Sequence, residues 1–463
     1  ADAEPSRPRS MVFGAGGSPG TPATADAEPS RPRSMVFGAG GSRPAAAASA
    51  GRREADGATG SWRWNVDRWL LETGGLDAGD GNAHLQAVVT VDARPRDSAW
   101  SLRLGARLDG QAQRGDLQEY DGLALDYDES WLRYRRGDWQ ITAGAQRIIW
   151  GRTDEFSPTD RLSTRDYTRL VLDPLEYRRR ASPALRIEWA AMNRELDLVY
   201  LPRFREAELP GADSIWFPVD RASGAVVGLP LPEALQPALR GARVDNAIDG
   251  DPGYAVRYAQ TGASWDFAVT AQRVHNPEPY FTLVQAPTPT RPAQLAAVYP
   301  RGWVLGGDAG MALGAYTLRA EAAWLEASPY TRADSFALGL SEELNWALGV
   351  DAFPGDGDLR VTAQVTGRHL LDADNPVDFE DILTLLGDVE TPLIMAGRPW
   401  RVRLRYSFRL DEHGSYLNPE LVFTGWEPSE LYLGAHLFDG DYGTAEDFYG
   451  DRDMAVIGWR ARF

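Results

Sequence analysis

The sequence predicts a single large antiparallel transmembrane β-barrel of 16 to 18 strands, an all-β fold closed on itself. Three observations predict it. Apolar and polar residues alternate with a period of two along most of residues 61–463, and the connections between the alternating runs include both short polar turns and long loops. No apolar stretch approaches the roughly 18 residues that a membrane-spanning helix requires.

The alternating runs are the predicted strands. In residues 100–108, apolar side chains occupy every second position, which is typical of a strand with one apolar and one polar face. We count about 17 runs, whereas a single-chain barrel normally has an even number of strands. One further strand within 372–397 would complete 18, and merging two runs would leave 16. The clearest runs are 85–91, 100–108, 139–145, 185–189, 196–200, 254–258, 265–271, 303–305, 316–324, 336–340, 359–365, 400–408, 431–437 and 455–463.

The aromatic content supports a membrane barrel. The chain has 16 Trp, 17 Tyr and 15 Phe, and many of these rings fall where the alternating runs begin or end. A transmembrane barrel places such rings in two belts at the lipid interface, whereas a water-soluble protein would need a large core to bury them. A soluble β-sandwich assembly is the alternative, but its strands need not end in aromatic residues.

The first 60 residues have a different composition. Residues 1–18 recur without change at 25–42, and Ala, Gly, Pro and Ser dominate the segment 1–60. We expect a disordered leader there because no apolar periodicity is available to build a core. A partner-binding tail is the alternative. The barrel is then expected to comprise residues 61–463.

Composition excludes several function classes. The 48 basic and 66 acidic residues give a formal charge of −18, which argues against binding to a nucleic-acid backbone. The absence of Cys excludes disulfides, thiolate zinc sites and iron–sulfur clusters. We therefore expect no nucleic-acid partner, no cofactor and no metal site.

The last run, 455–463, has apolar residues at alternate positions and ends in Phe463. It resembles the C-terminal strand of Gram-negative outer-membrane barrels, in which Trp459 and Phe463 would form part of the assembly signal. The resemblance implies a bacterial outer-membrane location, contact with lipid and lipopolysaccharide, and recognition by the barrel-insertion machinery. A soluble strand that ends in Phe by chance is the alternative.

A second resemblance concerns residues 146–180, which begin GlnArgIleIleTrpGlyArg, and the segment 201–210, LeuProArgPheArgGluAlaGluLeuPro. These segments resemble the strand, inserted loop and following loop of alginate-export-like outer-membrane channels of unassigned substrate. The resemblance implies a channel or exporter but identifies no substrate-binding residue.

If apolar side chains face lipid, the alternate residues face the lumen. On 400–408 these residues include three arginines, spaced about 7 Å apart along the strand. The clear inward acids are fewer, namely Glu188, Asp266 and Glu321, and we expect the other acids mainly in loops such as 372–390 and 439–453. Because Arg stays charged and binds carboxylate or phosphate, the pattern predicts an anion pathway. Pairing of these arginines with loop carboxylates is the alternative. The predicted pathway is Arg103, Arg107, Arg186, Arg257, Arg319, Arg360, Arg368, Arg401, Arg403, Arg405 and Arg460, with Arg462 of the same parity.

The segment 151–180 carries nearly balanced charges and is predicted to fold inward as a constriction loop. An ordinary solvated surface loop is the alternative. The residues expected to line the constriction are Arg152, Asp154, Glu155, Asp160, Arg161, Arg165, Asp166 and Arg169.

No catalytic motif accompanies the five histidines, so we expect no enzymatic activity. Two of them have lumen parity, and a wall role is expected for both. The sequence thus favours an outer-membrane channel or exporter for an anionic or polar solute. A scaffold or sheath for a periplasmic or extracellular partner protein, or a conduit for hydrophobic molecules, is the alternative. The histidines are His84, His275, His369, His413 and His436.

Overall fold

The computed structural model describes residues 61–76, 79–115, 119–355 and 358–463. The predicted leader with its duplicated segment lies outside these residues. Within them, almost all regular structure is β-strand, as predicted, and the helices are single turns of three or four residues. None of these helices is long and apolar enough to cross a membrane.

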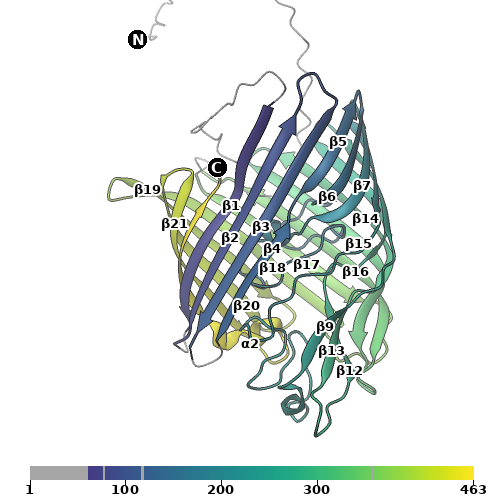
Figure 1. Cartoon of the computed structure of the whole chain (residues 1–463), viewed down its shortest axis with the longest axis vertical. Helices are drawn as coiled ribbons and strands as arrows, with labels where there is room; N and C mark the ends of the chain where they lie inside the picture. Colours follow the sequence, from purple (N-terminus) through teal and green to yellow (C-terminus); the bar gives the residue numbers. More distant parts are fainter. Residues whose placement is uncertain (1–60, 77–78, 116–118, 356–357) are drawn as a thin grey trace, which may run out of the picture. The chain divides into compact units, whose positions relative to one another are not determined.

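Nineteen strands hydrogen-bond into one sheet (Figure 1). In chain order they are β1 (Ser61–Leu76), β2 (Gly81–Arg94), β3 (Trp100–Arg114), β4 (Tyr120–Tyr127), β5 (Ser130–Arg136), β6 (Trp139–Gln146), β7 (Ser182–Ala191), β8 (Arg194–Leu201), β10 (Gly253–Thr261), β11 (Trp265–His275), β14 (Arg301–Leu313), β15 (Tyr316–Thr331), β16 (Leu338–Ala352), β17 (Arg360–Leu370), β18 (Asp381–Met395), β19 (Arg398–Arg409), β20 (Gly414–Trp426), β21 (Ser429–Gly440) and β22 (Met454–Ala461). A separate small sheet contains β9 (Arg243–Ala247), β12 (Tyr280–Gln285) and β13 (Gln294–Val298). The helical turns are α1 (Leu175–Arg178), η1 (Gln236–Leu239), α2 (Ala445–Phe448) and η2 (Gly450–Arg452).

The large sheet is a closed antiparallel barrel. β1 pairs with β2 on one side and with the last strand, β22, on the other. β4 and β5 both pair with β3 and share one position in the wall, so the 19 strands make a barrel of 18. The predicted fold is therefore confirmed, at the upper end of the predicted strand number.

The strand expected within 372–397 is β18. Its presence also corrects the prediction of an acidic loop over 372–390, because Asp388 and Glu390 belong to this strand and not to a loop. The alternation is hard to recognise there, since Leu385 and Leu386 are adjacent and apolar residues fall on both faces. The run predicted at 336–340 is also corrected: β16 begins at Leu338, and Phe336 lies in a turn with a φ of 53°.

Aromatic residues mark one end of the wall. Trp100, Trp139, Trp265 and Tyr316 are the first residues of β3, β6, β11 and β15, and all four side chains are exposed on the outer face. Each follows a short turn at the end of the barrel where β1 begins and the chain ends (Figure 1). The long connections 147–181, 202–252 and 276–300 lie at the opposite ends of the strands. This asymmetry is typical of outer-membrane barrels.

The long connections pack against the barrel and against one another. Residues 170–172 and 215–216 join a buried apolar cluster with the inner side chains of β1 and of β20–β22. A second cluster lies between the small sheet and residues 217–242. The interior is therefore partly filled by these connections, which hold the candidate site in place.

Candidate functional site

Residues 151–180, here called the strap, are fixed to the wall at two places. The first is Glu321 on β15, which is only 3% exposed. Its carboxylate accepts hydrogen bonds from the Thr153 hydroxyl at 2.9 Å, the Ser157 hydroxyl at 2.8 Å, and the Thr159 amide and hydroxyl at 2.7 and 2.8 Å. One buried carboxylate thus binds three residues of the strap, and these three residues span positions 153–159.

Neighbouring wall residues reinforce this first attachment. Arg319 donates to the backbone oxygen of Arg152 at 2.7 Å and to the Asp154 carboxylate at 2.9 Å. The Arg152 guanidinium is ion-paired with Asp308 on β14. On β17, Gln364 donates to the backbone oxygen of Phe156 at 2.7 Å. The first attachment therefore covers β14, β15 and β17.

The second attachment lies on a different part of the wall. Arg68 on β1 donates to Asp173 at 2.6 Å, and Arg169 is ion-paired with Glu72 on the same strand. Burial alone would raise the pKa of Asp173, but the guanidiniums of Arg169 and Arg68 outweigh it and hold that pKa well below its usual range. Arg405 on β19 donates to the backbone oxygen of Leu172 at 2.8 Å.

The two attachments show where the strap runs. β1 and β15 are far apart around the ring of paired strands, so a segment that contacts both must cross the space that the barrel encloses. Arg107 on β3, ion-paired with Asp166, adds a contact between the two attachments. The strap therefore lies inside the barrel.

The eight residues predicted for the constriction all lie in the strap. Asp160 accepts from Arg179 at 2.7 Å and from Arg165 at 3.1 Å, and Glu155 accepts from Arg178 at 3.0 Å. Burial opposes ionisation of Glu155, but Arg178 and Arg405 outweigh it and lower its pKa. Arg161 donates to the Pro158 backbone oxygen. Most of these charged side chains thus form ion pairs or hydrogen bonds within the strap or with the wall. Few of them remain available to bind a permeant.

The predicted inward arginines are accompanied by more acids than expected. Ten of the carboxylates that pair with them lie on strands and were not among the inward acids predicted. Three of them lie on β18, whose register was not predicted, and on β20, which was not listed among the clearest runs. Asp197 has inward parity within the predicted run 196–200 and was overlooked, and the other six lie beyond the ends of the predicted runs. The carboxylate partners are Asp92 and Glu129 for Arg103, Asp109 and Asp166 for Arg107, Glu188 and Asp197 for Arg186, Asp308 for Arg257, Asp154 and Asp351 for Arg319, Asp388 for Arg360 and Arg403, Glu343 for Arg368, Glu390 and Glu430 for Arg401, Glu420 and Glu430 for Arg460, and Glu176 for Arg462.

The three arginines of β19 are not equivalent. Arg401 and Arg403 have side chains that are 24% and 26% exposed and lie within 4 Å of acids of β18. Arg405 is buried, donates to the strap and to the Tyr416 hydroxyl at 2.9 Å, and has no ion-pair partner among the described residues. Two of the three therefore face water, and the third is a structural contact.

Two further sequence predictions fall on described residues. Phe463 exchanges two 2.9 Å backbone hydrogen bonds with Val66, and the Trp459 ring lies 5.7 Å from that of Trp69, so both extend the seam between β22 and β1. Their role in assembly stays a prediction.

The histidines of lumen parity are both buried: His436 bonds to the Tyr416 hydroxyl at 2.8 Å, and His84 has no hydrogen-bond partner in the described part of the chain.

Sequence reasoning missed Arg68 and Glu72, which hold the second attachment. β1 has a register shift between Val66 and Arg68, and this irregularity breaks the alternation that identifies a strand. The signal that could have found them is the resumed alternation after Arg68, where the residues at 68, 70 and 72 share the inner face.

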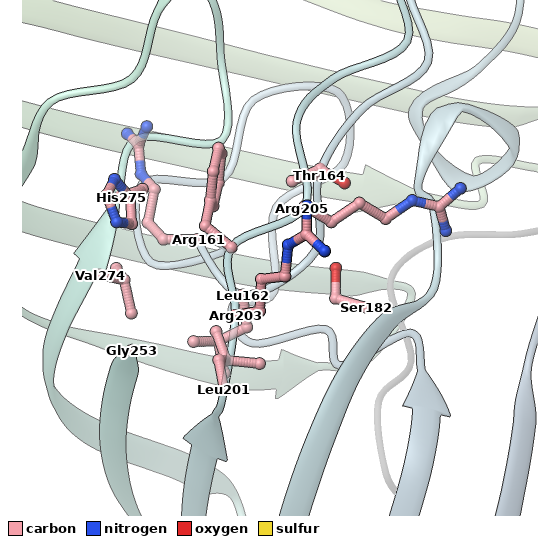
Figure 2. A pocket seen from close by; sticks show the side chains of 11 residues that line it. Arg161, Leu162, Thr164, Ser182, Leu201, Arg203, Arg205, Gly253, Val274 and His275 are labelled. Atoms are coloured by element: carbon pink, nitrogen blue, oxygen red, sulfur yellow. The ribbon is translucent and has the colours of Figure 1, made fainter. Parts of the chain in front are cut away.

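A small enclosed cavity lies between the strap and the ends of β7, β8, β10 and β11 (Figure 2). Its volume is about 10 Å³, the size of one water molecule. The hydroxyls of Thr164 and Ser182 line it without other hydrogen-bond partners. The cavity is thus suited to a buried water. Among the described residues, no group of His, Asp or Glu side chains is arranged to hold a metal ion.

Comparison with known proteins gives only distant structural likenesses. No protein-family model matches the sequence, and no curated protein matches it. Among solved structures, OccAB3 of Acinetobacter baumannii is 9% identical with a TM-score of 0.48, over 88% of this chain and 99% of that one. OpdL of Pseudomonas aeruginosa is 12% identical with a TM-score of 0.47, over 87% and 98%. OmpF of Salmonella typhi is 10% identical with a TM-score of 0.44, over 87% and 98%. None of these three is an alginate exporter by its description, so that narrower resemblance stays a prediction.

Proposed function

We propose that the chain is an outer-membrane channel, narrowed by the strap, through which small polar solutes pass with a preference for anions. The membrane location is supported by the outer face of the wall. Leu104, Leu348 and Leu433 are each more than half exposed there, and the aromatic residues at the strand ends match an interfacial belt. Apart from one edge of β4, the paired strands satisfy their backbone hydrogen bonds within the wall, as the bilayer core demands.

The preference for anions rests on one observation: in many ion pairs of the wall, the guanidinium is the more exposed partner. In the Arg368–Glu343 pair, the exposed side-chain fractions are 37% and 4%. The same order holds for Arg186 with Asp197, Arg257 with Asp308, Arg403 with Asp388, and Arg460 with Glu420. A permeant therefore meets the positive member of these pairs first.

Five pairs have the opposite order: Arg103 with Asp92, Arg107 with Asp109, Arg319 with Asp154 and with Asp351, and Arg401 with Glu430. Because positive and negative groups are both present, we expect a modest preference for anions and not strict exclusion of cations. Exposed guanidiniums bind carboxylate and phosphate through paired hydrogen bonds, so the favoured solutes carry such groups.

Planar-bilayer recording of the purified protein tests the channel. We expect discrete conductance steps in potassium chloride and none from a heat-denatured sample of the same preparation. Folded protein that inserts into the bilayer without conducting would contradict the proposed channel.

A further inference from the structure

One part of the barrel wall lacks a neighbouring strand. β4 pairs with β3 along its whole length, from Tyr120 opposite Gln113 to Tyr127 opposite Ala106. The next strand of the wall, β6, pairs with β5 and β7 but not with β4, because it ends level with Ser130. Among the described residues, no strand pairs with the second edge of β4. In Figure 1, loops and not strands follow β4 on that side.

Apolar side chains cover the outer face of this free edge. Leu123 and Leu125 on the outer face of β4 are each 78% exposed, more than Leu104 or Leu132 on the fully paired wall nearby. An unpaired strand edge is costly in a bilayer because its backbone groups find no water there. The position therefore needs a substitute for the missing strand.

Side chains supply that substitute from the inner face. Asp126 of β4 is ion-paired with Arg180 and with Arg205. Arg180 lies just before β7 and Arg205 just after β8, so these two pairs connect the free edge to the next complete part of the wall. Arg205 also stacks on the Tyr127 ring, with 4.3 Å between the guanidinium carbon and the ring centroid. These side-chain contacts can break without the loss of any backbone hydrogen bond between paired strands.

The strands beyond these ion pairs are apolar on their outer face. On the inside, the small cavity beside Arg205 is lined by Leu162, Leu201, Phe204 and Val274 together with polar side chains (Figure 2). On the outside, a groove of about 460 Å³ follows the outer faces of β7, β8, β10, β11 and β14. Its lining is Leu185, Ile187, Leu198, Val199, Tyr200, Tyr254, Ala255, Val256, Ala271 and Trp303.

We propose that the wall opens sideways between β4 and β7 and passes amphipathic carboxylates between the barrel interior and the bilayer. The carboxylate of such a molecule takes the place of the Asp126 carboxylate on Arg180 and Arg205. The displaced Asp126 side chain, which is 22% exposed in the closed state, turns into the water of the lumen, where it keeps its charge. Its hydrocarbon tail leaves past the free edge of β4 and enters the outer groove. This route goes beyond the axial channel and depends only on the barrel being embedded in a membrane.

The test uses the fact that the chain contains no cysteine. In the variant Asp126→Cys with Arg205→Cys, a reversible bifunctional thiol reagent bridges the two positions and locks the wall. The probe is a dodecanoate with an environment-sensitive fluorophore, and the readout is its initial uptake rate by cells whose outer membrane contains lipopolysaccharide. We expect cells with the bridged protein to match cells without the protein. Reduction of the bridge should raise uptake several-fold, because the wall can then open and Arg180 remains to pair with the carboxylate of the probe. Equal uptake by the bridged and reduced forms would overturn the proposal.

A single substitution provides a second measurement. Asp126→Asn keeps the size of the side chain but removes its charge, and we expect uptake to rise several-fold above that of the natural protein. The matched control is Asp121→Asn on the same strand, where the carboxylate pairs with Arg114 on the exposed outer side. If cells with either variant take up the probe at the same rate, the ion pairs of Asp126 do not keep a lateral route closed.

Ion conductance of the locked protein separates this inference from the axial channel. Unchanged conductance with blocked uptake supports both proposals. Unchanged conductance with unchanged uptake removes the lateral route and leaves the channel. Lock-dependent uptake without any conductance removes the channel and leaves the lateral route.

Discussion

Arg68 of β1 and Asp173 of the strap are joined by a 2.6 Å hydrogen bond across 105 residues of sequence. This pair and Glu321 hold the strap at opposite parts of the wall. Because a buried charge that loses its partner is strongly destabilising, both attachments must form together for the strap to cross the barrel stably.

Replacing Glu321 by Gln should loosen the first attachment. The amide keeps the size of the side chain but cannot accept from all the donors of residues 153–159, so we expect a loss of about 1–3 kcal/mol of stability for each donor left without an acceptor. The measurement is the temperature at which the folded barrel changes its mobility on a denaturing gel. The matched control is Glu326→Gln on the same strand, because Glu326 is 43% exposed and its ion pair with Arg273 should contribute less than about 1 kcal/mol. Equal temperatures for the two variants would contradict the assigned role of Glu321.

Removing residues 153–177 should raise the single-channel conductance, since the strap occupies cross-section that ions would otherwise use. The control is a variant without residues 288–290, which belong to the β12–β13 connection and are exposed. Unchanged conductance in the strap deletion would mean that the narrowest part of the pathway lies elsewhere.

Mild acid should leave the strap in place. The lowered pKa values of Asp173 and Glu155 mean that their stabilising contribution is fully present above the ordinary value of about 4 and is lost only as pH falls toward the lowered values. We therefore expect the same conductance at pH 7 and pH 5. An increase at pH 5 to the level of the variant Asp173→Asn would show that these carboxylates are protonated in mild acid.

Arg405→Gln should weaken the attachment of the strap to the wall and leave the ion selectivity of the channel unchanged. The substitution removes the hydrogen bonds to Val171, Leu172 and Tyr416, and each buried acceptor left without a donor costs about 1–3 kcal/mol. We expect a lower gel-shift temperature and noisier conductance, with an unchanged reversal potential in a salt gradient. A large shift of reversal potential with unchanged stability would place Arg405 in the pathway instead.

The alternation of side chains was enough to predict the closed barrel, because burial of one face forces a period of two wherever pairing is regular. It failed at the register shift in β1, which hid Arg68 and Glu72. It also failed where apolar residues fall on both faces, since adjacent Leu385 and Leu386 hid the register of β18 and thus its inward acids. Acids beyond the ends of the predicted runs, such as Asp308 and Glu343, were missed as well, and these omissions made the predicted lumen more basic than the wall in fact is.

The partners of the strap could not be predicted at all. Glu321 was recognised as an inward acid, but its contact with Thr159 joins positions 162 residues apart. No local pattern encodes such a pairing, since it depends on how the whole barrel closes. The free edge of β4 is hidden for the same reason: Leu123 and Leu125 alternate like any other strand, and only the pairing shows that the neighbouring strand is missing.

The most direct test of the proposed function is the reversal potential of the natural protein in a potassium chloride gradient, compared with the double variant Arg401→Gln with Arg403→Gln. These two exposed guanidiniums lie beside Asp388, Glu390 and Glu430, so their removal leaves the carboxylates in excess. We predict a reversal potential on the anion-selective side for the natural protein and a shift toward cation selectivity in the double variant, with Arg114→Gln on the outer face as an unchanged control. Cation selectivity of the natural protein, or a double variant with the same reversal potential, would contradict the anion pathway.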